Sequence, residues 1–223
     1  MQFDASLVGP ILRETVAAMR ANARVLAMVY VAATAVGVGY DLALGLLGEA
    51  ALLYYVVYIF FMLFLQACVT IALLERGGFV LPGPRRWRIA SLFGISIIAG
   101  LGIFFGLLVL VLPGLFLTGR WYLAAPALFH RDMSASEAMR ASWDLTEQSW
   151  LSITLVAVTA FAVQAAPLLA VGYLLENGGR MDWPVSLAMN AASQAGWLLG
   201  VSAAATAYMM LGGEEDRMRK IFG

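Results

Sequence analysis

The sequence is poor in charge and has a single cysteine. Only 13% of its 223 residues are charged, whereas 62% are hydrophobic; a soluble domain carries about 25% charged residues. So little polar surface cannot keep a globule of this length in water, and we therefore expect lipid to be the solvent. Cys68 lies inside an apolar run and has no second cysteine to pair with, which excludes an internal disulfide.

The side chains that usually carry chemistry are also scarce. The only histidine, His130, stands beside Arg131 and Asp132, and we expect it to be a solvated loop residue. One histidine cannot supply a metal cluster, and a serine nucleophile would need a base held within reach. No phosphate-binding or dinucleotide loop is present, and no basic face alternates with aromatic residues as in nucleic-acid-binding proteins. We predict a protein that is not an enzyme and has no cofactor, metal or nucleic-acid partner.

Long apolar runs dominate the chain. A bilayer core about 30 Å thick needs about 20 apolar residues as helix. Five runs meet that length, over residues 25–47, 51–74, 89–112, 151–175 and 183–211. A shorter run, 115–129, contains Arg120 and follows the helix stop Leu112-Pro113-Gly114. We expect it to form a tight hairpin with the run before it.

The charges predict an orientation. The loops 75–88 and 130–149 are both basic, so the chain must cross the membrane an even number of times between them. A cytoplasmic N-terminus places twelve of the fourteen basic residues on the cytoplasmic side, as the positive-inside rule requires. The prediction is an all-α integral membrane protein, a single domain over residues 1–223, with six transmembrane helices and both termini in the cytoplasm.

Two further segments are expected to be helical without crossing. Residues 5–21 and 134–149 are amphipathic, and the second begins with the capping box formed by Ser134 and Glu137. Both are expected to lie along the cytoplasmic interface. For residues 134–149, packing on protein is an equally good interpretation.

Arg120 needs a reason for being in an apolar run, because a charge at membrane depth is costly and suggests function. Its side chain could reach the outer interface or form an ion pair with Asp41 or Asp182. A substrate or headgroup contact is the alternative.

Amides and hydroxyls also occur at membrane depth. Asn190, Ser193 and Gln194 share one helical face. Such groups usually join helices, and a polar path is the other interpretation. The remaining members of this intramembrane polar set are Gln66, Thr70 and Gln164. Trp197 falls in the middle of a run, where its indole N–H needs a partner.

Two glycine pairs have the spacing that lets helices approach closely: Gly102 with Gly106, and Gly196 with Gly200. They predict either packing inside the monomer or a homo-oligomer interface.

One stretch resembles a known family. It contains Leu112-Pro113-Gly114, Arg120-Trp121, Ala125-Pro126 and the run from Ser136-Glu137 to Ser142-Trp143. This pattern is similar to the YciC-like family of bacterial inner-membrane proteins and to the membrane domain attached to some glycerophosphoryl diester phosphodiesterases. The family positions are Pro113, Gly114, Arg120, Pro126, Glu137 and Ser142. The resemblance implies the six-helix fold and the location. The soluble phosphodiesterase domain is absent here, so the resemblance implies no esterase activity.

The expected function is to bind or organise membrane lipids or membrane partners, in envelope maintenance or as a transport accessory. Anionic headgroups are expected at the basic cytoplasmic rim, at Arg85, Arg86, Arg88 and Arg140. The alternative is a small transporter or channel whose path is lined by Arg120, Gln164, Asn190 and Gln194.

Overall fold

The chain folds into helices. The computed structural model describes residues 5–47, 51–81, 89–131, 133–176, 178 and 182–222, and these ranges contain no strand. The helices are α1 (Val8–Ala21), α2 (Ala23–Leu47), α3 (Ala51–Arg76), α4 (Ile89–Val109), α5 (Val111–Trp121), α6 (Ala124–Arg131), α7 (Ala135–Leu145), α8 (Trp150–Glu176) and α9 (Trp183–Phe222). Five of the described helices, α2, α3, α4, α8 and α9, are long and apolar enough to cross a membrane. The predicted all-α membrane protein is confirmed at this level.

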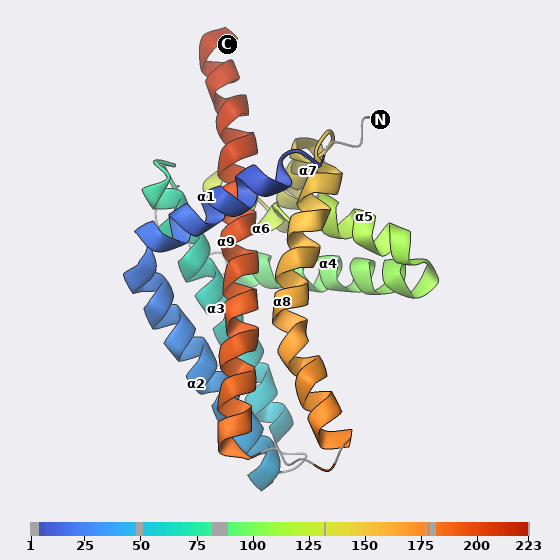
Figure 1. The fold of residues 1–223 in the computed structure, drawn as a ribbon. Helices are drawn as coiled ribbons and strands as arrows, with labels where there is room; N and C mark the ends of the chain where they lie inside the picture. Colours follow the sequence, from blue (N-terminus) through green and yellow to red (C-terminus); the bar gives the residue numbers. More distant parts are fainter. Residues whose placement is uncertain are drawn as a thin grey trace.

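Four of these five long helices run alongside one another. α9 packs against α2, α3 and α8, and α2 packs against α3 (Figure 1). The end of α2, the start of α3, the end of α8 and the start of α9 lie together at the bottom of Figure 1. We call this the turn end. The opposite end carries α1, α6 and α7 and is called the α7 end.

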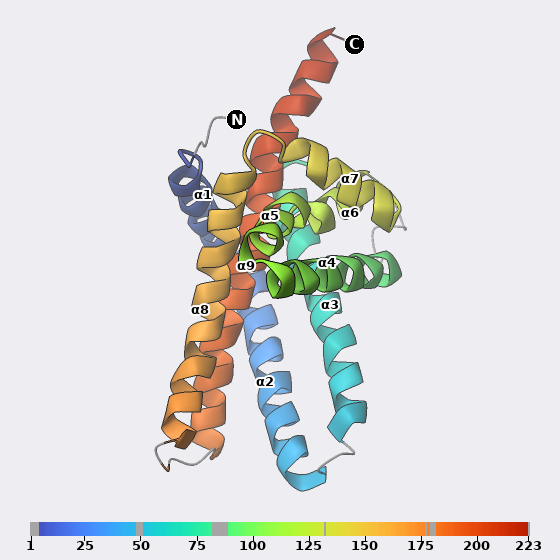
Figure 2. The ribbon, with the colours of Figure 1, turned by 90° about the vertical axis from the view of Figure 1, so that its right-hand side faces the viewer.

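The fifth long helix runs across the other four. In both views α4 and α5 lie side by side and nearly at right angles to α3, α8 and α9 (Figures 1 and 2). The predicted hairpin is therefore present, but its turn is at Leu110, whose backbone is extended (φ −155°, ψ 135°). Pro113 and Gly114 lie in the first turn of α5, where a proline loses no helical hydrogen bond. The hairpin closes tightly, since a Cβ on Gly106 would come 2.9 Å from the Gly114 Cα.

The predicted sixth helix over 115–129 is not one helix. α5 has 11 residues and α6 has 8, and the chain turns between them. At 1.5 Å per residue they are about 16 and about 12 Å long, so neither spans a bilayer core of about 30 Å. The prediction followed apolar composition, which says nothing about where a helix bends.

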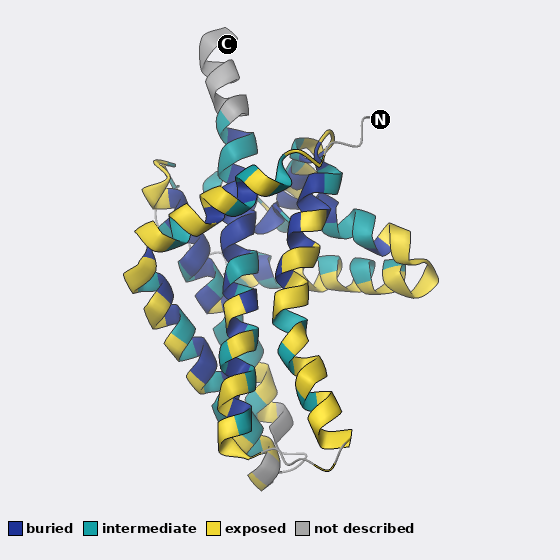
Figure 3. Cartoon of the chain, viewed as in Figure 1, coloured by how far each residue is buried: buried dark blue, intermediate teal, exposed yellow. Residues whose placement is uncertain are grey.

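The core lies towards the α7 end. Fully buried side chains from α3, α6, α7 and α9 meet there, among them Leu74, Phe129, Ala138 and Tyr208 (Figure 3). By contrast, apolar side chains of α4 and of the end of α8 are exposed. A helix that is apolar all round is covered either by protein or by lipid, so these exposed surfaces are suited to lipid.

α7 lies on protein. It buries Ala138, Met139 and Ser142, and this decides between the two interpretations of residues 134–149. The capping box is confirmed, because the Glu137 carboxylate accepts from the Ser134 backbone N–H at 2.8 Å and Ser134 Oγ accepts from the Glu137 N–H. α1 likewise buries Ile11 and Thr15 and packs on α8 and α9.

His130 is not a solvated loop residue. It belongs to α6, its Nδ1 lies 2.7 Å from the Tyr208 hydroxyl, and its ring meets Phe79 edge-on. The flanking charges of Arg131 and Asp132 suggested a loop, but the histidine joins α6 to α9.

The four glycines of the close-approach pairs pack inside the chain. A Cβ on Gly102 would collide with the Trp121 ring, and one on Gly196 with the Gln164 backbone. A Cβ on Gly200 would touch Ala160 at 3.4 Å. These contacts and the one between Gly106 and Gly114 account for both pairs without a second copy of the chain.

Candidate functional site

Arg120 is buried among aromatic rings. Its exposed fraction is 5%, and its Cζ lies 4.8 Å from the Trp143 ring centroid and 5.1 Å from that of Phe116. Its Nη1 donates to the Trp143 backbone oxygen at 3.0 Å, while its Nε has no hydrogen-bond partner. Guanidinium over an aromatic face is a favourable electrostatic contact, so the charge is held by rings and a carbonyl.

Ser142 fastens the bend between α5 and α6. Its hydroxyl donates to the Arg120 backbone oxygen at 2.7 Å and accepts from the Leu123 N–H at 3.1 Å. Both backbone groups lie where the chain leaves helical geometry and would otherwise lack partners. The structure therefore brings together Arg120 and Ser142, two of the residues that carry the family resemblance. We call Arg120, Ser142, Trp143 and Phe116 the Arg120 junction.

α5 reaches the junction by lying closely on α8. A Cβ on Gly119 would overlap Thr154 Oγ1, and that hydroxyl donates to the Leu115 backbone oxygen at 3.2 Å. A small residue at 119 is needed for this approach.

Asp41 and Asp182, the predicted ion-pair partners of Arg120, bind other residues. Asp41 Oδ2 accepts from Ser186 Oγ at 2.5 Å and from Asn190 Nδ2 at 2.8 Å, and Asp182 Oδ1 accepts from the Val185 N–H at 3.2 Å. Arg120 contacts α7 at the α7 end, so its side chain does not reach towards the turn end. In a straight helix over residues 115–129, Arg120 would lie near the turn end. Because the chain bends after α5, Arg120 lies beside α7 instead.

Two of the amides join helices. Asn190 binds Asp41 across α9 and α2, and Gln194 Nε2 donates to the Tyr58 hydroxyl of α3 at 3.3 Å. Ser193, on the same predicted face, leaves its Oγ without a partner. Asn190 and Gln194 therefore act between helices, one of the two roles that the sequence allowed.

A groove of about 360 Å³ lies beneath the hairpin. Its lining residues come from α3, α4, α5, α6, α8 and α9, and Figure 2 shows the α4–α5 hairpin crossing in front of α3 and α9. Its apolar lining includes Leu92, Ile95, Ile103 and Phe161. Its polar lining consists of Gln66, Thr70, Ser96, Thr118, Trp121, Tyr122, Gln164 and Trp197.

The groove collects part of the predicted polar set. Gln66, Thr70 and Gln164 line it, and so does Trp197, for which the sequence predicted a need of a partner. Arg120, Asn190 and Gln194 do not line it. Of the four residues proposed for a transport path, only Gln164 lines this groove.

Sequence reasoning missed Tyr122. Its hydroxyl donates to the Gly200 backbone oxygen at 2.7 Å, so it ties the bend after α5 to α9 beside the groove. Its position in an apolar run next to a tryptophan suggested only an interfacial aromatic residue.

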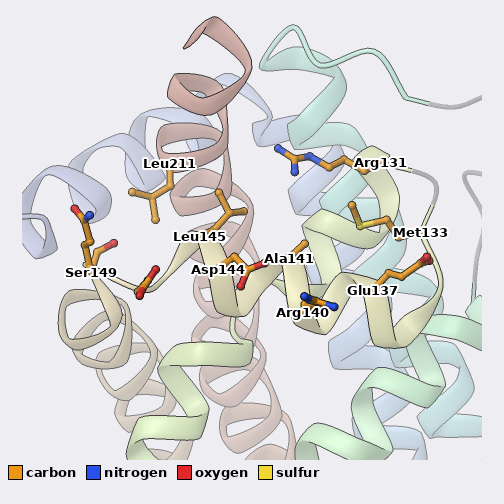
Figure 4. A pocket seen from close by; sticks show the side chains of 11 residues that line it. Arg131, Met133, Glu137, Arg140, Ala141, Asp144, Leu145, Ser149 and Leu211 are labelled. Atoms are coloured by element: carbon orange, nitrogen blue, oxygen red, sulfur yellow. The ribbon is translucent and has the colours of Figure 1, made fainter. Parts of the chain in front are cut away.

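A second cleft, of about 550 Å³, lies at the α7 end (Figure 4). Arg140, one of the predicted headgroup contacts, lines it together with Arg131, but so do Glu137, Asp144 and Glu147. The cleft thus presents both signs of charge. The other predicted contacts, Arg85, Arg86 and Arg88, lie outside the described residues.

Comparisons of the chain with protein-family models, with curated proteins and with solved structures gave no match. The resemblance to the YciC-like family stays a prediction, carried by the residues quoted for it.

Proposed function

We propose that this chain is a non-enzymatic protein of the bacterial inner membrane that holds a lipid or a similar amphiphile in the groove beneath the hairpin. The groove supports this proposal because its lining combines hydrocarbon side chains with amides. The long helices that form it have the apolar composition of membrane-spanning helices. Ligand pockets are typically about 300–1,000 Å³ and mostly apolar with a few polar groups, and the groove, at about 360 Å³, fits that description.

Part of the proposal concerns the membrane topology. α2, α3, α8 and α9 cross the bilayer, and the α4–α5 hairpin lies within its cytoplasmic half. Large side chains of α4 that stay exposed, such as Leu101, Phe104 and Leu108 (54–69% exposed), are then covered by acyl chains. Arg76, Arg131 and Arg140 lie at the α7 end, so the positive-inside rule makes that end cytoplasmic. The two basic loops require an even number of crossings between them, and a hairpin that does not cross the membrane meets this requirement as well as one that crosses twice.

Cysteine labelling tests this topology. With Cys68→Ala as background, Leu112→Cys places a thiol at the hairpin tip and Gly178→Cys places one after α8, at the turn end. A membrane-impermeant maleimide added outside spheroplasts should label position 178 and leave position 112 unlabelled. Labelling at both positions would support six crossings and overturn the arrangement proposed here.

The binding proposal is tested by filling the groove. Ala99 of α4 lines it, whereas a Cβ on the neighbouring Gly100 would meet nothing within 4 Å. We expect Ala99→Phe to lose the amphiphile that copurifies with the wild type, and Gly100→Phe to keep it. The measurement is the amount of extracted lipid per protein by mass spectrometry, with thermal unfolding to show that both variants are folded. Equal retention by a folded Ala99→Phe variant would contradict the proposal.

A further inference from the structure

The polar side chains of the groove are all uncharged. Among its lining residues there is no Asp, Glu, Lys, Arg or His. Arg120, the nearest candidate for a positive charge on α5, turns towards α7 and its guanidinium is held by Trp143 and Phe116. A phosphate or carboxylate placed in the groove would have no opposite charge beside it among the described residues, and burying an unpaired charge is very costly.

Several of these uncharged groups have no hydrogen-bond partner among the described residues. Ser96, Thr118 and Tyr122 donate to backbone oxygens. Five others form no side-chain hydrogen bond with any described residue: Gln66, Thr70, Trp121, Gln164 and Trp197. Thr70 is only 1% exposed, and the other residues of this group are half-buried. A polar group that lipid covers without a hydrogen-bond partner costs about 1–3 kcal/mol.

The contrast among the amides is informative. The long helices carry four amide side chains, Gln66, Gln164, Asn190 and Gln194. Asn190 and Gln194 are bonded to neighbouring helices. The two that line the groove are not, although they come from two different helices, α3 and α8. Donors and acceptors are thus offered to the groove while the rest of the bundle uses its amides for packing.

We propose that the groove selects an uncharged amphiphile with a hydroxyl, ester or amide polar end, such as a monoacylglycerol or a long-chain alcohol. This rests on the proposed function and specifies the ligand of that site. The Gln66 and Gln164 amides hydrogen-bond its polar end, each offering both a donor and an acceptor. The apolar lining covers its hydrocarbon part, and a volume of about 360 Å³ suits one chain better than the two of a phospholipid.

Tryptophan quenching provides the test, because Trp121 and Trp197 line the groove. The protein is reconstituted in phosphatidylcholine nanodiscs and titrated with two dibromostearoyl probes, a neutral monoacylglycerol and an anionic lysophosphatidylglycerol. We expect saturable quenching by the neutral probe, displaced by unbrominated monoacylglycerol, and only unsaturable quenching by the anionic one. The Gln66→Leu/Gln164→Leu double variant should bind the neutral probe with an affinity about tenfold lower or more, because two hydrogen bonds are lost.

The outcomes separate this inference from the function on which it rests. If the anionic probe binds as tightly as the neutral one and Ala99→Phe abolishes both, the groove binds lipid but does not select against charge, and the inference is wrong. If Ala99→Phe changes the binding of neither probe, the groove is not the binding site and the proposed function is wrong. Unchanged affinity of the neutral probe in the double variant would show that the amides are not its contacts.

Discussion

The Arg120 junction and the groove lie on two sides of α5 and treat polar atoms in opposite ways. On one side, the Ser142 hydroxyl uses both its donor and an acceptor on backbone groups, and the Arg120 charge rests between two rings. On the other, Thr118 binds only its own helix, and the amides of Gln66 and Gln164 line the cavity and form no hydrogen bond with a described residue.

This difference distinguishes polar groups that stabilise the fold from polar groups that are available to a ligand. At the junction, the Ser142 hydroxyl increases stability because it satisfies two backbone groups. Polar groups without a partner in a cavity lower stability once water is excluded, and they persist where a ligand meets them. Substitutions on the two sides of α5 should therefore have effects of different size, and even of different sign, on the free energy of unfolding.

The largest effect is expected at Ser142. Ser142→Ala leaves the Arg120 oxygen and the Leu123 N–H without their partner in a fully buried place. We expect a loss of about 2–4 kcal/mol of unfolding free energy, since each orphaned group costs about 1–3 kcal/mol. Denaturation by sodium dodecyl sulfate in mixed micelles measures it. Ser136→Ala, at an exposed position of the same helix, is the control and should stay within about 0.5 kcal/mol.

The sequence predicted the helical class and most of the long helices because hydropathy reports the solvent of each segment directly. It also predicted the Ser134–Glu137 capping box, whose partners are three residues apart. Such features depend on local spacing. The resemblance pointed to Arg120 and Ser142 separately, and their contact across 22 residues appears only in the fold.

The direction of the hairpin could not be predicted. Composition makes α4 as suitable for crossing as α3, and the parity of basic loops gives only an even number. The bend after Trp121 depends on Ser142 and Tyr122 binding distant backbone groups. For the same reason the sequence suggested Asp41 or Asp182 as partners of Arg120, whereas its side chain contacts Trp143 of α7. No sequence pattern predicted the groove, because its lining residues come from six helices: α3, α4, α5, α6, α8 and α9.

A smaller effect is expected at Arg120. Arg120→Met keeps a long apolar side chain between Phe116 and Trp143 and removes a cation whose Nε has no partner. Replacing a buried charge by an apolar residue of similar size is often close to neutral, although the Trp143 oxygen loses a donor. We expect a loss of about 1 kcal/mol or less in the same assay, with lipid copurification unchanged. Lost copurification in a folded variant would move Arg120 from the junction to the binding site.

The smallest effect on stability, and one of opposite sign, is expected in the groove. Gln66→Leu and Gln164→Leu remove amides that form no hydrogen bond with the described residues, and each adds an apolar side chain of similar size. In ligand-free protein, delipidated by detergent washing, each variant should be as stable as the wild type or more stable by about 0.5–1 kcal/mol, because an unsatisfied polar group is lost.

Asn190→Leu is the matched control for the groove variants, since it removes an amide that is bonded to Asp41. It should lose about 0.6 kcal/mol or more, the usual size of a hydrogen bond between helices in a membrane. If the groove variants lost as much as Asn190→Leu, their amides would be holding the bundle together as the others do. The distinction between the two sides of α5, and with it the case for a ligand at Gln66 and Gln164, would then disappear.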